Sequence, residues 1–329
     1  MKKIFRATVV MFLVMALFSP LAPAADRENY YVTNLTVDKI LNAGGNDITP
    51  MANPSGGRDF FVDGNKAVAG NGLSWPKAFK TLAAAIAASD TYMADSRNRA
   101  WAKRNRIFVV GDVLTENLVK FPTKCDVIGV GSYDGNVKPG ISGRHLPVGE
   151  AYGTRFYNIH WKALAHASPI VTLTNAASGV QFIGNTFDGT LGTMTSAILA
   201  TASPFLEVRD SDFVGTFVTS YITFGAGEAG RTRIIGNRML GTAAKGIVAP
   251  GTTTASWIPL IQDNTIRATG KPIDDAASVF SVVNNRLSTD INIGTTTDGY
   301  TFALGLASGN ILTGLNGVAA TVPFAVIAE

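Results

Sequence analysis

The acidic residues of this chain are the first candidates for chemistry. Hydrolysis of a glycosidic bond needs two carboxyl groups that converge in a groove, whereas elimination from an acidic sugar needs a basic residue and cationic groups around the substrate carboxylate. Asp188 and Asp210 lie in two copies of a repeated phrase and are the candidate catalytic residues. The matching positions of neighbouring copies hold no second acid, so the sequence does not supply a pair of catalytic carboxylates.

Two aromatic residues, Tyr157 and Trp161, are the candidate carbohydrate-binding residues. Flat rings on an exposed sheet face pack well against sugars. If the chain has a binding groove, we expect it on the face that carries these two rings together with Asp188 and Asp210. Because the acids are scattered along the chain, we expect binding without turnover.

Metal ligands are sparse. A zinc site needs at least three ligands, and the histidines His145, His160 and His166 have no partner in the sequence that completes one. Two Asp-Gly-Asn segments lack the regular acidic spacing of a calcium loop, and the adjacent Asp274 and Asp275 are expected in a turn. The sequence therefore predicts no metal site and no cofactor. Ca²⁺ is the one possible ligand left, and no sequence motif supports it.

The elements that position these residues are set by a repeat. One polar position recurs at spacings of 26, 26, 27, 21 and 25 residues, and a large apolar residue follows two places later each time. Alternation in a strand puts both on one face, pointing inward. The polar positions are Asn185, Ser211, Asn237, Asn264, Asn285 and Asn310, and the apolar ones are Phe187, Phe213, Met239, Ile266, Leu287 and Leu312.

A fixed period of this length with one short strand per unit is typical of a stacked solenoid. The units are rich in Gly, Thr, Asn and Val and show no helical stripe, so the prediction is an all-β fold, a parallel β-helix solenoid with an N-terminal capping helix. Parallel crossovers are almost always right-handed, which predicts a right-handed helix. Trp161 precedes Phe187 by 26 residues, so the repeat extends one coil further back.

The first residues are predicted to be an export signal. Lys2, Lys3 and Arg6 precede an apolar run over residues 7–18, and Ala-Pro-Ala at 22–24 provides a cleavage site. The mature protein is then expected to be secreted, periplasmic or on the cell surface, without a membrane span. Loss of residues 1–24 leaves 25 basic against 24 acidic residues, which does not favour a nucleic-acid partner.

The rest of the chain divides into three predicted segments. Residues 25–57 are an extension and linker, 58–105 a capping strand and helices, and 106–329 the parallel β-helix. In the cap, Ser74 is the expected N-cap of a helix. Its apolar stripe is expected to consist of Phe79, Leu82, Ala83, Ile86 and Ala87.

Residues 60–86 carry a family resemblance. The sequence F-F-V-D-G-N, followed by G-N-G-L-S-W-P-K-A-F-K-T-L-A-A-A-I, resembles the start of pectate-lyase-like right-handed parallel β-helix proteins. The resemblance implies a strand, a loop and a helix that cap the first coil. It implies little about chemistry, because lyases, hydrolases, adhesins and phage proteins share this start. Residues 126–132 and a Trp- and Arg-rich segment are also similar to β-helix proteins of tailed phages.

Three classes of function remain open. The first is an exported or virion-surface β-helix that serves as a structural or glycan-contacting element. The second is a lyase or hydrolase acting on an extracellular polysaccharide, and the third is a self-associating adhesin. Scattered acids favour the first class. The apolar residues 318–329 include an expected last strand at 324–328 with no successor, which predicts a homo-oligomer formed through this end.

Overall fold

The structure is a computed structural model. It describes residues 56–95, 103–131, 138–149, 151–164, 166–174, 177–277 and 279–289, together with three short strands at 307–308, 311–313 and 319–321. The predicted signal at 1–24 and nearly all of the predicted linker lie outside the described residues. The described part belongs to one unit, Asn53–Glu329.

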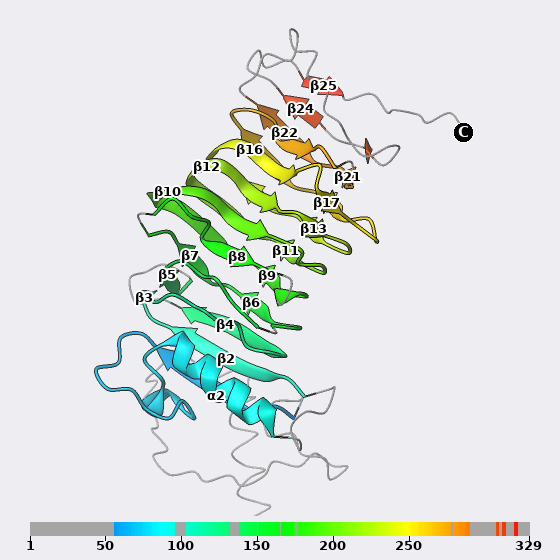
Figure 1. The fold of residues 1–329 in the computed structure, drawn as a ribbon. Coiled ribbons are helices and arrows are strands. Elements are labelled where there is room, and N and C mark those ends of the chain that lie inside the picture. Colours follow the sequence, from blue (N-terminus) through cyan, green and yellow to red (C-terminus); the bar gives the residue numbers. More distant parts are fainter. Residues whose placement is uncertain are drawn as a thin grey trace, which may run out of the picture. The chain divides into compact units, whose positions relative to one another are not determined.

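The fold is a parallel β-helix, as predicted (Figure 1). Successive coils each add one strand to a ten-stranded sheet, so that its strands lie in chain order. Its pairs are parallel throughout the described strands. The members are β1 (Asp59–Asp63), β2 (Asn105–Val110), β4 (Cys125–Gly131), β6 (Arg155–Tyr157), β9 (Gln181–Ile183), β11 (Glu207–Arg209), β14 (Arg233–Ile235), β18 (Leu260–Gln262), β21 (Ser281–Val283) and β23 (Ala307–Ser308).

A thirteen-stranded sheet forms a second wall. The strands along its main path are β3 (Val113–Thr115), β5 (Gly140–Ser142), β7 (His160–Lys162), β10 (Thr186–Ala200), β12 (Asp212–Phe224), β15 (Arg238–Met239), β19 (Thr265–Ala268), β22 (Arg286–Thr289), β24 (Ile311–Thr313) and β25 (Ala319–Thr321). Three more strands pair off this path: β8 (Val171–Leu173) with β10, β16 (Thr242–Ala249) with β12, and β20 (Ile273–Asp275) with β16. A two-stranded sheet joins β13 (Gly227–Glu228) to β17 (Thr253–Thr254).

Two apolar ladders fill the space between the walls. In the thirteen-stranded sheet, Phe187 pairs with Trp161 on one side and with Phe213 on the other. The Phe187 and Phe213 rings stack with centroids 4.9 Å apart. In the ten-stranded sheet the matching column is Phe156, Phe182, Val208, Ile234, Ile261 and Val282, all buried. The predicted inward direction of the large apolar residues is confirmed for Phe187, Phe213, Met239, Ile266 and Leu287.

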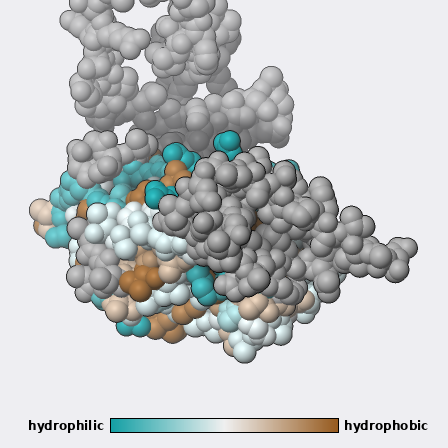
Figure 2. Space-filling view, turned by 90° about the horizontal axis from the view of Figure 1, so that it is seen from above, coloured by the Kyte–Doolittle hydropathy of each residue, from teal (hydrophilic) through white to brown (hydrophobic). Residues whose placement is uncertain are grey.

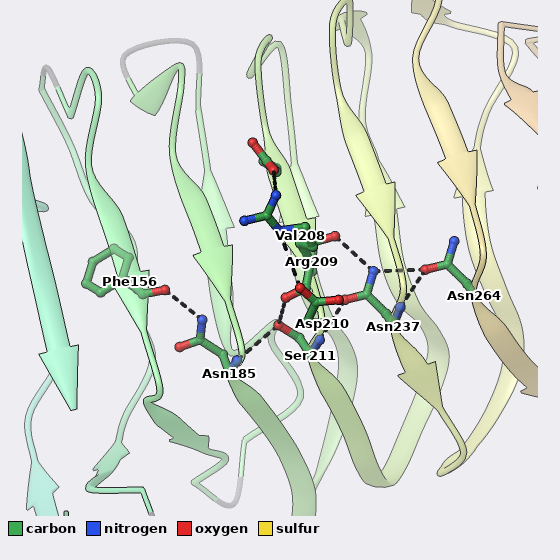
Figure 3. A network of polar contacts seen from close by, with 9 residues as sticks. Phe156, Asn185, Val208, Arg209, Asp210, Ser211, Asn237 and Asn264 are labelled. Atoms are coloured by element: carbon green, nitrogen blue, oxygen red, sulfur yellow. Dashed lines mark hydrogen bonds and ion pairs between the residues drawn. The ribbon is translucent and has the colours of Figure 1, made fainter. Parts of the chain in front are cut away.

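The polar column at the repeat centre is a hydrogen-bonded ladder (Figure 3). The backbone N–H of Asn185 donates to Ser211 Oγ over 3.1 Å, and that of Ser211 donates to Asn237 Oδ1 over 3.0 Å. Asn237 and Asn264 continue the pattern, each donating its N–H to the next amide oxygen over 2.9 Å. The predicted register is therefore confirmed from residue 185 to 285, and Asn310 lies outside the described residues.

The helix that covers the first coil is α2 (Leu82–Ala94), at the β1 and β2 end of the stack (Figure 1). It begins after Thr81, whose side chain accepts from the Ala84 N–H, so the predicted N-cap at Ser74 is wrong. Ser74 instead precedes the short 3₁₀ turn η1 (Trp75–Lys77) and makes no side-chain cap hydrogen bond. Two backbone N–H groups at the start of α2 donate to the Glu116 carboxylate over 2.8 Å.

The buried face of α2 differs in part from the predicted stripe. Leu82, Ala85, Ile86, Ser89 and Met93 are buried, whereas the predicted Ala83 and Ala87 are exposed. Ser89 lies on the core side because Asn105 of β2 donates to its hydroxyl over 2.9 Å. This contact adds to the apolar face and to the hydrogen bonds with Glu116 that hold the helix on the first full coil.

The last described strand reverses the chain. β25 pairs with β24 in the antiparallel sense, with Leu312 opposite Ala320. The expected last strand at 324–328 lies outside the described residues. Seen from above relative to Figure 1, the coloured residues visible on the surface mix hydrophilic and hydrophobic types (Figure 2).

Candidate functional site

From β6 to β21, each coil turns from the ten-stranded to the thirteen-stranded sheet through one residue with φ between 51° and 67°. The register places these residues in one column, called here the Asn corner. All are of the kinds that tolerate the left-handed conformation, because glycine has no Cβ and Asn or Asp can form local hydrogen bonds. The column is Asn158, Gly184, Asp210, Gly236, Asp263 and Asn284, with φ between 51° and 67°.

Asp210, a predicted catalytic candidate, belongs to this corner. Its φ is 51° and its Oδ2 lies 3.4 Å from the Nε of its sequence neighbour Arg209 (Figure 3). The two residues beside it in the column are Gly184 and Gly236, which have no side chains to act with it. Asp210 is explained by the turn, and it shares the Arg209 guanidinium with Glu207, whose carboxylate lies 3.5 Å from Arg209 Nη1.

Asp188, the other candidate, lies on the outer face of β10. Its carboxylate lies 3.2 Å from His160 Nε2 and accepts a hydrogen bond from the Thr190 N–H over 2.8 Å. The hydrogen bond with His160 is the main reason that the pKa of Asp188 is lowered to about 2. An acid that stays ionised at neutral pH cannot protonate a leaving group.

The neighbours of Asp188 form a charged network on the thirteen-stranded sheet. Thr186 pairs with Asp212 in the next coil, and Asp188 pairs with Val214. Asp188 and Asp212 are therefore diagonal neighbours, two residues out of register. Comparing only the matching positions of the repeat does not bring them together. Lys138 Nζ donates to Thr186 Oγ1 over 2.8 Å and lies 4.0 Å from Asp212. Arg238 approaches Asp212 to 3.8 Å. Burial lowers the pKa of Lys138. The carboxylates are thus held among cationic and imidazole groups.

The two predicted sugar platforms have different surroundings. Trp161 is 0% exposed, its ring packs between Phe156 and Phe187, and its Nε1–H donates to Asn185 Oδ1 over 3.2 Å. The prediction that Trp161 binds carbohydrate is wrong, because no ligand reaches a ring inside the core. Tyr157 lies half-buried on the outside of β6, in the other sheet from Asp188. The four residues of the predicted binding face are therefore not on one face. Tyr157 lies on the ten-stranded sheet, Asp188 on the thirteen-stranded sheet and Asp210 at the Asn corner, and Trp161 lies in the core.

Asp275 and His145 are two further titratable residues that lie buried in the core. Asp274 and Asp275 lie in β20 and pair in register with Val248 and Ala249, so the predicted turn at these two residues is wrong. The buried Asp275 carboxylate accepts the N–H groups of Val279 and Phe280 just beyond the strand. His145 accepts the Leu118 N–H at Nδ1, and its Nε2 has no hydrogen-bond partner. Among the described residues, no group of three or more His, Cys, Asp or Glu side chains is arranged to hold a metal ion.

A second column of left-handed residues precedes the strands of the ten-stranded sheet. We call this column the basic corner. It consists of Lys124, Gly153, Gly179, Phe205 and Arg231, with φ of 48°, 70°, 72°, 63° and 58°. Three of its members are large residues that a left-handed backbone disfavours by about 1 kcal/mol each. Such residues persist where function needs them more often than where packing alone decides, so this corner is a functional candidate.

A pocket of about 370 Å³, the corner pocket, opens at one end of the basic corner. Tyr152 and Phe205 form aromatic walls and are 47% and 42% exposed. Basic side chains and two glycines complete the lining. The described lining residues are Lys103, Arg104, Lys124, Tyr152, Gly153, Arg155, Gly179, Gln181 and Phe205.

Next to the pocket, the basic corner continues as a stack of alternating rings and charge. The Arg231 guanidinium carbon lies 5.1 Å from the Phe205 ring centroid and 4.3 Å from that of Trp257 in the following coil. Trp257 is 60% exposed. Cation–π contacts of this kind hold all three side chains in place while leaving ring surface open to solvent.

One signal in the sequence could have located this corner. Gly153 precedes Gly179 by 26 residues, and Phe205 and Arg231 follow at further intervals of 26, whereas Trp257 lies one residue before the position that the register matches to Arg231. That interval is the period of the Asn ladder. These residues are of different types and form no recognisable sequence motif, however. Their shared position becomes clear only from the strand pairing in the folded structure.

No helix in the described ranges has the length and apolar character needed to cross a membrane. No family model, curated protein or solved structure matches this chain.

Proposed function

We propose that this chain is an exported parallel β-helix protein that contacts a glycan along the basic corner and does not cleave it. The observation that carries the proposal is the Phe205–Arg231–Trp257 stack. It presents two exposed rings in coils that are separated by the coil of Arg231, along a stack whose strands repeat about every 4.8 Å, which suits an extended polymer. Export rests on the signal-like residues 1–24, and a virion surface is the alternative location.

The non-enzymatic part of the proposal is supported by the acids. Asp188 is held ionised by His160, and Asp210 occupies a turn beside two glycines. Neither arrangement provides the protonated carboxyl group and facing carboxylate that hydrolysis requires. A polysaccharide lyase or hydrolase and a self-associating adhesin are the alternatives.

The contact surface is tested by binding the purified chain to immobilised polysaccharides. We expect Trp257→Ala to weaken binding at least tenfold. Tyr157→Ala serves as the matched aromatic variant on the sheet face, and we expect it to bind as the parent does. Loss of binding in Tyr157→Ala but not in Trp257→Ala would move the contact to the sheet and contradict the proposed corner.

The absence of cleavage is tested separately. Reducing ends or unsaturated uronates are measured after long incubation of the same polysaccharides with the chain. We expect none above the level of a heat-denatured control. Release of either product by the parent, lost in Asp188→Asn, would establish an enzyme and overturn this part of the proposal.

A further inference from the structure

We propose that the charged network around Thr186 is an ester-hydrolysing site, in which the Thr186 hydroxyl attacks a short acyl ester. Lys138 is the base for this attack, and His160 activates the water that later releases the acid. The site lies on the outer face of the thirteen-stranded sheet. It is separate from the glycan contact at the basic corner, and the bond that it breaks is not a glycosidic bond.

Parallel pairing brings the reacting groups together from separate coils. His160 of β7 pairs with Thr186 of β10, which pairs with Asp212 of β12. Neighbouring strands lie about 4.8 Å apart, so Thr186 has an imidazole on one side and a carboxylate on the other. Lys138 adds an amine, because its Nζ lies 2.8 Å from Thr186 Oγ1. The Thr186 hydroxyl is therefore surrounded by groups that can accept its proton.

Lys138 is suited to act as the first base. Its side chain is 21% exposed, and its Nζ lies 4.0 Å from Asp212, too far for a hydrogen bond. Burial lowers the pKa of Lys138, and the charge of Asp212 opposes this only in part. The contact between Nζ and Thr186 Oγ1 suits both protonation states, because an ammonium group donates to the hydroxyl and a neutral amine accepts from it. Loss of one proton from Lys138 thus makes the contact a pair of base and nucleophile.

His160 is oriented as a second base by Asp188. The Asp188 carboxylate is ionised at neutral pH and can only accept, so the imidazole proton lies on His160 Nε2, 3.2 Å from Asp188 Oδ2. The Thr190 N–H holds the other carboxylate oxygen over 2.8 Å. Nδ1 of the neutral imidazole keeps its lone pair, and no hydrogen bond in the described part of the chain engages it. Asp188 is thus a positioning residue, like the carboxylate of a hydrolase triad.

The same face offers a place for an apolar acyl group. Val214 pairs with Asp188, and Leu240 follows in the next coil; their side chains are 38% and 43% exposed. Arg238 lies 3.8 Å from Asp212, a distance that leaves its side-chain N–H groups open to the negative oxygen that forms during the attack. The face therefore fits a short apolar acyl group against Val214 and Leu240, with its carbonyl oxygen toward Arg238.

The reaction balances without a cofactor. Thr186 Oγ1 forms a bond to the acyl carbon, and the bond from that carbon to the alcohol oxygen breaks. Lys138 Nζ takes the hydroxyl proton and passes it to the departing alcohol. In the second step His160 Nδ1 takes a proton from water, whose oxygen bonds to the acyl carbon. The bond to Thr186 Oγ1 then breaks, His160 returns the proton to Thr186, and the carboxylic acid leaves.

The activity is tested with phenyl acetate and phenyl butyrate. Release of phenol by the full chain is compared with a heat-denatured blank. We expect turnover above the blank, a loss of at least tenfold in Thr186→Ala and in Lys138→Met, and retention in Thr186→Ser. Thr265→Ala, in the same outward column, and Lys245→Met, at another half-buried lysine, are the matched controls and should hydrolyse as the parent does. The rate should rise with pH to a midpoint below the ordinary pKa of a lysine, because burial lowers the pKa of Lys138.

A second measurement separates the roles of the two bases. We expect His160→Gln and Asp188→Asn to keep the first burst of phenol and to lose at least tenfold in steady-state turnover, because they slow only the release of the acid. Mass spectrometry should then find the acyl group on Thr186 in both variants. A purely structural role of Asp188 would instead lower the burst and the turnover together.

Two results would overturn the proposal. One is a parent chain that releases no phenol above the blank. The other is turnover that persists in Thr186→Ala, or acyl groups found only on lysines, which would show an adventitious reaction of surface amines. Thermal unfolding confirms that each variant is folded, and Thr186→Val repeats the test if Thr186→Ala is not. The glycan contact stands or falls separately, with Trp257→Ala.

Discussion

Asn237 shows at the scale of a single residue what the ladder contributes. Its Oδ1 accepts the Ser211 N–H, while its Nδ2 donates to the Val208 carbonyl oxygen and to Asn264 Oδ1, all at 2.8–3.0 Å and buried. Asn237→Ala removes these partners at once and leaves backbone groups unpaired, so we expect a loss of about 3 kcal/mol in unfolding free energy. Urea titration measures it. Arg238→Ala, on the outer face next door, should change stability by less than about 0.5 kcal/mol.

His145 makes stability depend on pH. Burial, and to a lesser extent His166, lowers its pKa from 6.5 to about 3. Between these values the unfolded chain binds a proton that the folded one excludes, so stability is full above pH 6.5 and falls by about 1.4 kcal/mol per pH unit below it. Urea titrations at pH 7 and pH 4 should show this slope, and His145→Leu should flatten it. Equal slopes in both proteins would contradict the assignment.

The basic corner predicts a conflict between stability and binding at one residue. Lys124 has φ of 48°, a conformation that Asn tolerates better. We expect Lys124→Asn to raise unfolding free energy by roughly 0.5 kcal/mol while it weakens binding to the polysaccharide that the basic corner contacts. Lys162→Asn, on the outside of β7, should not gain stability. A loss of stability in Lys124→Asn would mean that the lysine packs better than its backbone suggests.

At the scale of the elements, the stacked rings dominate the core. Phe187 and Phe213 are fully buried and stack on each other, so Phe187→Ala and Phe213→Ala should each cost about 3–5 kcal/mol. Thr186 is one residue away and points outward, where its hydroxyl accepts a hydrogen bond from Lys138. Thr186→Ala should therefore change the unfolding free energy by no more than about 0.5 kcal/mol. Denaturant titration compares the three. Similar losses in all of them would contradict the assignment of the two strand faces.

The elements also explain which features could be predicted from the sequence. The Asn ladder and the ladder of Phe187 and Phe213 were predictable, because parallel pairing forces matching residues into contact and the types repeat. The same register placed Trp161 beside Phe187, which implies an inward ring and was incompatible with a sugar platform there. The basic corner escaped prediction because its common property is a backbone angle shared by Lys, Gly, Phe and Arg.

At the scale of the whole molecule, the end of the stack decides how copies of the chain meet. The sequence predicts an open last strand that pairs with another subunit. In the structure β25 turns back and pairs with β24, so the chain itself covers that strand edge among the described residues. This pairing favours an end that the chain covers itself over the self-association that the sequence predicts, and a second copy would have to pair with β25.

Deletion of residues 318–329 separates the two roles of this segment. The deletion removes β25 and leaves the backbone groups of β24 without their antiparallel partner, and an unprotected edge strand promotes pairing between copies. If the segment acts as a cover, light scattering should find the intact chain monomeric and the deleted chain aggregated, which is the outcome we expect from the observed hairpin. A uniform oligomer of the intact chain that becomes monomeric on deletion would instead assign the segment to an interface between subunits.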